Sequence, residues 1–489
     1  MNLIIEANNF PINKVSMSNT DFLSLTPFMI LALAPIIIMI VISIYRNYDV
    51  VYGFSVLSMM AAFASIFYIL PIIPHSIAPL FIIDNYSLFF LGIIFISALL
   101  VIFLSYDYLK QLDGIREEYY IILFTSTLGA SLLAVANHFI LFFLGIETLT
   151  LSLYILIAFE KTKDQSIEAG IKYLVLASVS SVFLLFGMGL IYFTFGTMQF
   201  SAIVKAMSHL VHLPPLFIYG FGMMLVGIGF KLALVPFHMW TPDVYQGAPA
   251  PVSSYIATVS KGAVMAVFIR FFFSIKGFEN PAIFMVVSGI AILSMFMGNL
   301  LAIQQKNIKR LLAYSSIANM GYLIIILLTA SDKGIQSAIF YLITYFITTM
   351  GAFGVISLLS TKDFEAERIE DYRGLFWKQP WIAGVFTLCM LSLAGIPITA
   401  GFIAKFYLMY EGMKAGLMML IFSLIINSVI GLYYYLRVIT TMFSTESNVE
   451  LPSISILGKL TLAFITVSIL ILGIYPGWLI DFIVKHAIL

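Results

Sequence analysis

Fourteen continuous apolar stretches run along this chain, and each is long enough to cross the roughly 30 Å of hydrocarbon in a bilayer as a helix. Because the stretches are continuous rather than alternating, they predict helices and not the short period-two strands of a membrane barrel. The fold class expected is therefore an all-α membrane protein with about fourteen transmembrane helices. The stretches cover approximately residues 27–45, 50–71, 86–106, 119–137, 139–159, 167–194, 216–239, 251–272, 281–301, 308–330, 335–359, 381–410, 415–443 and 455–478.

The composition excludes several other classes of protein. With 61% apolar and only 10% charged residues among 489, the chain has too little polar surface to cover a soluble globule. A net charge of +1 without a basic domain argues against nucleic-acid binding. Cys389 is the only cysteine, which excludes disulfides and iron–sulfur ligation within the chain, and the sequence contains no phosphate-binding or dinucleotide motif. We therefore expect this chain to hold no cofactor and no metal.

Basic residues in the loops and toward the ends of the stretches are distributed unevenly between the two sides of the membrane. The loops after odd-numbered stretches hold 14 of them and the opposite side holds 7, and four lysines inside the stretches complete the 25. The positive-inside rule then places the odd loops in the cytoplasm and both termini outside. The longest internal connection, from about Thr361 to Pro380, mixes both signs of charge and is interpreted as an amphipathic cytoplasmic linker. It could serve as a solvated connector or as a docking surface for a partner.

Five charged residues are assigned to the interior of the apolar stretches rather than to their ends. A charge at the centre of a bilayer costs about 2.5–3.5 kcal/mol even on the mildest scale, so such residues usually mark ion paths or proton relays. The alternatives are a carboxyl group buried in its neutral form and lysines that extend to the membrane surface. For Lys172 and Lys405, the residues alone do not decide between a relay and a lysine that extends to the membrane surface. The five are Glu147, Lys172, Lys231, Lys261 and Lys405.

Two prolines stand close to two of these lysines. Pro236 follows Lys231 and should free the carbonyl of Leu232, whereas Pro397 precedes Lys405 and should free the carbonyl of Leu393. Irregular backbone at membrane depth persists only beside protein or water. We therefore predict two broken helices, with a hydrated cavity at Lys231.

A switch can be expected where Lys231 meets the intramembrane carboxyl group. Burial lowers the pKa of a lysine, and a nearby carboxylate raises it again. If Lys231 pairs with and separates from Glu147, it can alternately hold and release a proton near neutral pH.

Three segments carry a resemblance to a known family. They are Gly229–Val252, which contains the string DVYQGAP; Gln305–Tyr322; and Pro397–Lys405. Together they resemble the helix 7–8, helix 9–10 and helix 12 signatures of the antiporter-like membrane subunits of respiratory complex I. The DVYQGAP wording and Ser260-Lys261 favour the N-type branch over the L-type and M-type branches. Ile398 is a departure, because the family often has a second proline there.

The resemblance implies an organisation and a set of functional residues. Family members contain two inverted five-helix repeats, helices 4–8 and 9–13, with discontinuous helices 7 and 12. Here these repeats correspond to residues 119–272 and 281–443, flanked by a three-helix segment (1–118) and a last helix (455–489). The family's relay residues match Glu147, Lys172, Lys231, Lys261 and Lys405, and its helix breaks match Pro236 and Pro397.

The resemblance also implies a function and partners. The chain is expected to move protons from the cytoplasm outward across an energy-transducing membrane, the inner membrane of a bacterium. Flavin, iron–sulfur clusters and quinone would belong to other subunits, and M-type and K-type membrane subunits would be neighbours. A subunit of an Mrp-type cation/proton antiporter or of a membrane hydrogenase shares the same lysines, and a stand-alone transporter or a purely structural arm are further alternatives.

Overall fold

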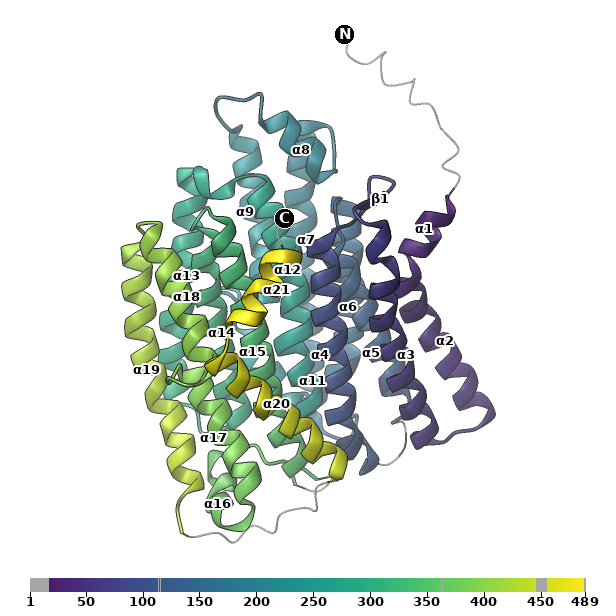
Figure 1. Cartoon of the computed structure of the whole chain (residues 1–489), viewed down its shortest axis with the longest axis vertical. Coiled ribbons are helices and arrows are strands. Elements are labelled where there is room, and N and C mark those ends of the chain that lie inside the picture. Colours follow the sequence, from purple (N-terminus) through teal and green to yellow (C-terminus); the bar gives the residue numbers. More distant parts are fainter. Residues whose placement is uncertain (1–16, 113, 115, 362–363, 446–454, 488–489) are drawn as a thin grey trace.

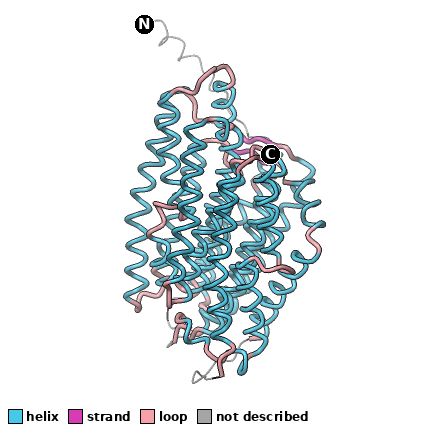
Figure 2. Tube along the Cα trace, turned by 90° about the vertical axis from the view of Figure 1, so that its left-hand side faces the viewer, coloured by secondary structure: helices cyan, strands magenta, loops and turns pink. Residues whose placement is uncertain are grey.

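The computed structural model describes residues 17–112, 114, 116–361, 364–445 and 455–487, in which long helices run side by side along the longest dimension of the molecule (Figure 1). Lys14, Lys362, Asp363 and both chain ends, which enter the predictions about orientation and the linker, lie outside these residues. Figure 2 shows loops gathered at the two ends of the bundle, with short interruptions part-way along it.

The helices confirm the all-α prediction. Among the described residues, twelve helical segments are long and apolar enough to cross a membrane, and the shorter α5 (Glu118–Ala134) and α17 (Pro380–Ala394) complete the fourteen crossings. The long segments are α2 (Thr26–Ile44), α3 (Tyr48–Ile69, with a 3-10 turn Leu70–Ile72), α4 (Asn85–Lys110), α6 (Phe139–Ile157), α7 (Asp164–Phe195), α9 (Pro215–Leu232), α11 (Ala250–Tyr255) joined to α12 (Lys261–Ser274) by the π-helical turn Ile256–Ser260, α13 (Pro281–Ile303), α14 (Ile308–Leu327), α15 (Asp332–Leu359), α19 (Met418–Met442) and α20 (Ile456–Ile474).

Short elements complete the described chain. They are α1 (Asn19–Ser24), α8 (Phe200–Met207), α10 (Trp240–Gly247), α16 (Leu375–Lys378), α18 (Ala400–Lys414), α21 (Gly477–His486), the 3-10 turns Gly277–Glu279 and Ile369–Tyr372, and the antiparallel strands β1 (His75–Ile77) and β2 (Phe81–Ile83), in which His75 pairs with Ile83. In Figure 1, α1, α8 and α21 lie toward one end of the bundle and α16 lies at the other. Helix α1 precedes the fourteen crossings and α21 follows them, and an even number of crossings is consistent with both lying at the same end.

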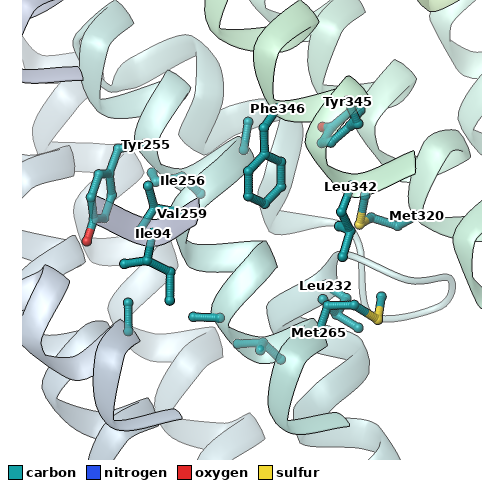
Figure 3. Packing of buried hydrophobic residues seen from close by; sticks show 14 of the residues in the cluster. Ile94, Leu232, Tyr255, Ile256, Val259, Met265, Met320, Leu342, Tyr345 and Phe346 are labelled. Carbon is teal, nitrogen blue, oxygen red and sulfur yellow. The ribbon is translucent and has the colours of Figure 1, made fainter. Parts of the chain in front are cut away.

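The centre of the bundle is formed by α11–α12, α14 and α15. Of the most apolar window in each, 94%, 89% and 89% of the residues are buried, against 33% in α2. Figure 3 shows this core, where Leu232 lies beside Met265 and where Phe346 projects from α15 toward α12. The ring of Phe346 occupies the space that a side chain at Gly262 would need. Lys261, one residue earlier, therefore enters the most tightly packed part of the molecule.

Two crossings are interrupted at the places that the prolines predict. Helix α9 ends at Leu232, where Ala233 adopts a left-handed conformation (φ 60°), and α17 ends at Ala394, where Gly395 does the same (φ 84°). Pro236 and Pro397 lie inside the connections that follow. The predicted positions of the breaks are confirmed, but the mechanism differs: left-handed residues end each helix, and the proline stands where the helix has already stopped.

The two breaks occupy corresponding places in the order of crossings. The broken α9–α10 is the fourth crossing of the set that begins with α5, and the broken α17–α18 is the fourth of the set that begins with α13. Because each set has five crossings, the second set starts on the opposite side of the bundle from the first. This order agrees with two inverted five-helix repeats.

The described part of residues 361–380 is amphipathic, as predicted, but it is more than a solvated connector, because one face of it packs onto the bundle. Ala366, Ile369, Tyr372 and Leu375 are buried. Apolar residues spaced between the charges pack onto the bundle, and the backbone of the linker bonds to the segment before α14, where the N–H of Ile369 donates to the carbonyl of Lys306 (2.9 Å). The linker is thus part of the fold at the end where α16 lies.

Candidate functional site

Lys231 lies in the last turn of α9 and is 3% exposed. Its ammonium group donates to the hydroxyl of Thr150 on α6 (2.5 Å) and to that of Tyr173 on α7 (3.1 Å). The side chain therefore points into the bundle and not toward a membrane surface. Where the sequence predicts a hydrated cavity, the structure provides two hydroxyl partners.

Glu147 lies one turn before Thr150 on α6 and is half-buried. Its carboxyl group accepts a hydrogen bond from Ser181 of α7 (2.5 Å). Glu147 and Lys231 thus share the interface of α6 with α7, but in this conformation they form no ion pair with one another. The predicted pairing corresponds to a different arrangement from the one observed.

Lys172 lies near the start of α7 and is half-exposed. Its ammonium group pairs with Asp243 of α10 (2.8 Å) and with Glu168 (2.7 Å), and 43% of its side chain is exposed. Asp243 also binds Arg310 of α14 (2.6 Å). Lys172 belongs to a charged cluster around α10, because it lies only two turns from the start of α7.

Lys261 is fully buried at the start of α12. It donates to the hydroxyl oxygen of Ser316 on α14 (2.6 Å), and the hydroxyl of Tyr345 on α15 donates to the same oxygen (2.6 Å). A serine hydroxyl can accept from both and still donate its own proton. Ser316 is therefore a junction between Lys261 and α15.

Lys405 lies in the second turn of α18 and is 7% exposed. Its ammonium group donates to the carbonyls of Leu393 (2.9 Å) and Ala394 (3.0 Å), the last two residues of α17. Helix ends leave such carbonyls unpaired and carry partial negative charge, so a cation is favoured there. The carbonyl of Leu393 has no helical hydrogen-bond donor, as predicted, and it accepts a hydrogen bond from Lys405 instead.

The break beside Lys405 has special backbone requirements. A side chain at Gly395 would lie 2.9 Å from Cδ of Lys405, so the close approach and the left-handed conformation both require glycine. Ile398 also has a positive φ of 77°. Proline, with φ near −65°, could not adopt this conformation. The absence of a second proline at position 398 therefore fits the local backbone.

A small polar cavity adjoins Lys405. It has a volume of about 10 Å³ open to water, close to the minimum for one molecule. Its lining includes Tyr341, Thr344, Tyr345 and Ser392, and the hydroxyl of Thr344 has no partner among the described residues. Tyr345 lines this cavity and also bonds to Ser316. Hydroxyl groups and one cavity thus connect Lys261 with Lys405.

Lys231 and Lys261 remain separated, although both lie in the first set of crossings. Among the hydrogen bonds of the described residues, none joins the Lys231 group to the Lys261 group. Thr241 of α10 and Ser254 of α11 carry buried hydroxyl oxygens without a partner on the elements between these lysines in the chain. The structure therefore brings Lys261 and Lys405 together, leaves Lys231 with Thr150 and Tyr173, and places Lys172 elsewhere.

The residues that complete the site escaped prediction for different reasons. Thr150, Tyr173, Ser316 and Tyr345 are neutral, and hydroxyl residues are common in membrane helices, so nothing in the sequence distinguishes them. Asp243 carried a usable signal, because a carboxylate follows closely after the break. The described residues contain no group of three or more His, Cys, Asp or Glu side chains placed to hold a metal.

Comparisons with known proteins bear on the family and on the fold of the chain. Residues 136–431 match the family described as NADH:quinone oxidoreductase/Mrp antiporter, TM. NADH-quinone oxidoreductase subunit N of Methylococcus capsulatus is 41% identical over 467 residues, which are 94% of this chain and 94% of that protein. A chain of respiratory complex I from Thermus thermophilus with bound aureothin is 31% identical with a TM-score of 0.81, covering 93% of this chain and 98% of that chain. A chain of the Mrp complex from Dietzia has the same fold, with a TM-score of 0.84 at 18% identity over 95% of this chain and 97% of that chain.

Proposed function

This chain belongs to the NADH:quinone oxidoreductase/Mrp antiporter family as an antiporter-like membrane subunit, and from that premise we propose that it carries protons outward through Glu147, Lys172, Lys231, Lys261 and Lys405. Electron transfer from NADH to quinone takes place in other subunits, which hold the flavin and the iron–sulfur clusters. M-type and K-type membrane subunits are the neighbours, and a bacterial inner membrane is the location. Both termini face outward, and residues 119–272 and 281–443 act as two transport units, flanked by 1–118 and 455–489.

Proton movement between Lys261 and Lys405 is supported by one observation above the others. Ser316 accepts hydrogen bonds from Lys261 and Tyr345, and Tyr345 lines the cavity that adjoins Lys405. Each of these groups can give up one proton while it takes another. When the Tyr345 hydroxyl turns to accept from Ser316 and to donate into the cavity, a proton released by Lys261 has a route of hydroxyl groups. Lys405 takes up that proton when its amine is neutral.

In the first half, Glu147 and Lys231 hold charge on either side of the α6–α7 interface. When Lys231 leaves Thr150 and Tyr173 for Glu147, its positive charge is stabilised, and when it returns, the proton is released toward the second half. Lys172, paired with Asp243, supplies charge at the entry to this path. The energy scale is consistent: moving one charge against about 200 mV requires about 5 kcal/mol, comparable with the roughly 3–5 kcal/mol for breaking a buried ion pair.

The test removes a single oxygen from the route. Tyr345→Phe keeps the ring and should lower the number of protons moved per NADH oxidised by the purified complex in vesicles. Tyr86→Phe is the matched control, because Tyr86 is also buried and donates to the carbonyl of Ala266 (2.8 Å), away from the lysines. If both variants pump as the wild type does, the hydroxyl route is not used.

A further inference from the structure

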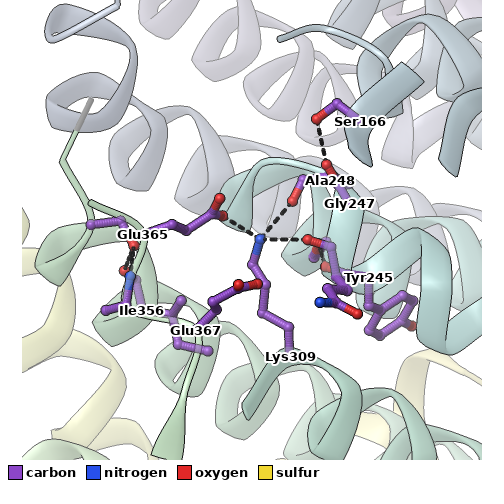
Figure 4. Close-up of polar contacts among 12 residues, drawn as sticks. Ser166, Tyr245, Gly247, Ala248, Lys309, Ile356, Glu365 and Glu367 are labelled. Carbon is purple, nitrogen blue, oxygen red and sulfur yellow. Dashed lines mark hydrogen bonds and ion pairs between the residues drawn. The ribbon is translucent and has the colours of Figure 1, made fainter. Parts of the chain in front are cut away.

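Lys309 is a fully buried lysine outside the five charged residues of the proposed route (Figure 4). It is the second residue of α14, and its ammonium group contacts three oxygens: the carbonyl of Gln246 (3.0 Å), the carbonyl of Ala248 (2.9 Å) and the carboxylate of Glu365. A buried cation with three acceptors is fully satisfied, whereas loss of any partner would leave charge uncompensated. These contacts join α14 to two segments far away in the chain.

The carbonyl partners of Lys309 belong to the end of α10, the short second part of a broken crossing. The carbonyl between them, that of Gly247, accepts from Ser166 of α7 (2.5 Å). Arg310, the next residue on α14, reaches Asp243 near the start of the same short helix (2.6 Å). The first turn of α14 therefore holds α10 at both ends, and Asn307 caps that turn by accepting from the N–H groups of Lys309 (2.9 Å) and Arg310 (3.1 Å).

Glu365 of the linker binds Lys309 and also a residue of the first set of crossings. Its carboxylate binds Lys309 and also Lys163, which precedes α7 (3.2 Å). Burial opposes ionisation of Glu365, but the Lys309 and Lys163 ammonium groups outweigh it and hold the pKa of that carboxyl below its usual range. Lys163 in turn pairs with Glu160 at the end of α6 (2.5 Å). The carboxylate thus ties the linker of the second set of crossings to the first set.

A short mechanical path leads from α10 to Lys231. Trp240, the first residue of α10, donates its indole N–H to the carbonyl of Phe230 (2.9 Å), the residue before Lys231. The indole also packs against Tyr173, with ring centroids 5.2 Å apart, and Tyr173 is a partner of Lys231. A shift of α10 would therefore move both the backbone and a hydrogen-bond partner of Lys231.

We propose that Lys309 and Glu365 form a latch between the two sets of crossings and act as positioning residues for Lys231. The latch holds α10 from α14 and the linker, so that rearrangement in the second set is transmitted to the lysine of the first. This inference rests on the proposed proton translocation. It adds a connection that runs along the end of the bundle, separate from the hydroxyl route through its centre.

The test is Glu365→Gln in the complete complex, with Glu370→Gln as the matched control in the exposed part of the same linker. We expect hydrogen exchange of residues 233–249 to become about tenfold faster, as expected when a charged contact that limits local opening is lost. The number of protons moved per NADH oxidised should fall in complexes that remain assembled. The control should change neither quantity. Glu365→Asp keeps the charge and shortens its reach, and should give intermediate values if the first variant fails to assemble.

Three outcomes would overturn the latch. One is wild-type exchange of residues 233–249 in an assembled Glu365→Gln complex, and another is faster exchange with an unchanged proton ratio. The third is wild-type behaviour of Glu365→Asp when Glu365→Gln does not assemble. Tyr345→Phe separates this failure from failure of the proposed function: if it lowers the proton ratio while the latch variants do not, only the latch is wrong.

Discussion

Replacing Lys405 with methionine preserves the length of the side chain and removes its proton site. The carbonyls of Leu393 and Ala394 then lose a charged donor at 2.9 and 3.0 Å. Two bonds to a charged group contribute about 3–6 kcal/mol together, but burial of the ammonium, which costs several kcal/mol, is also removed. The free energy of unfolding should therefore fall by no more than about 3 kcal/mol, and the complex should assemble.

The effect of Lys405→Met on transport should be much larger than its effect on stability. A backbone carbonyl is too weak a base to hold a proton, so a proton that reaches the cavity beside Tyr345 finds no amine to take it up. An added barrier of about 3 kcal/mol, the size of one charged hydrogen bond, slows transfer about 100-fold. The assay is acidification of vesicles that contain the purified complex, divided by the rate of NADH oxidation.

Lys405→Arg separates loss of charge from loss of a proton site. Guanidinium can bond to both carbonyls and restore stability, but it hardly deprotonates, so transport should stay low. A lysine that merely extended to the membrane surface would give the opposite pattern, with arginine fully tolerated. Wild-type acidification by an assembled Lys405→Met complex, or full recovery in Lys405→Arg, would refute the assignment.

Three further changes test other parts of the site. Glu147→Gln keeps the shape and the bond to Ser181 but cannot carry charge, so assembled complex should pump less; wild-type pumping would remove the carboxyl group from the route. Ser316→Ala leaves Lys261 without its acceptor and should lower both the proton ratio and the melting temperature, at a cost of about 1–3 kcal/mol. A membrane-impermeant thiol reagent should reach Glu370→Cys from the cytoplasmic side, and labelling only from the outer side would reverse the orientation.

The crossings and the intramembrane charges could be predicted because the membrane acts as a strict solvent. A bilayer requires long apolar helices and penalises each charge, so both features are visible residue by residue. The breaks were visible for the same reason, since Pro236 and Pro397 cannot continue a helix. Their precise cause was not, because Ala233 gives no sign in the sequence that it adopts a left-handed conformation.

The partners of the charges could not be predicted, since they come from distant parts of the chain. Thr150 lies 81 residues from Lys231, and Ser316 lies 55 residues from Lys261. Lys309 counts, in the sequence, only as one of the basic residues on the cytoplasmic side, together with Lys306 and Arg310. Only the return of the linker, with Glu365 56 residues away, converts this lysine into a buried one.

The two broken crossings also show why similar sequence signals need not create equivalent sites. Lys231 precedes its break and gives its ammonium group to two neutral hydroxyls, whereas Lys405 follows its break and binds the carbonyl end of the preceding half-helix. Carbonyls at a helix end are fixed in place and carry partial negative charge, but hydroxyls can rotate and also donate. The partners of Lys231 can therefore turn to follow it, whereas the partners of Lys405 stay fixed when its side chain moves away. The order of lysine and break along the chain, rather than the proline, decides which kind of acceptor each lysine meets.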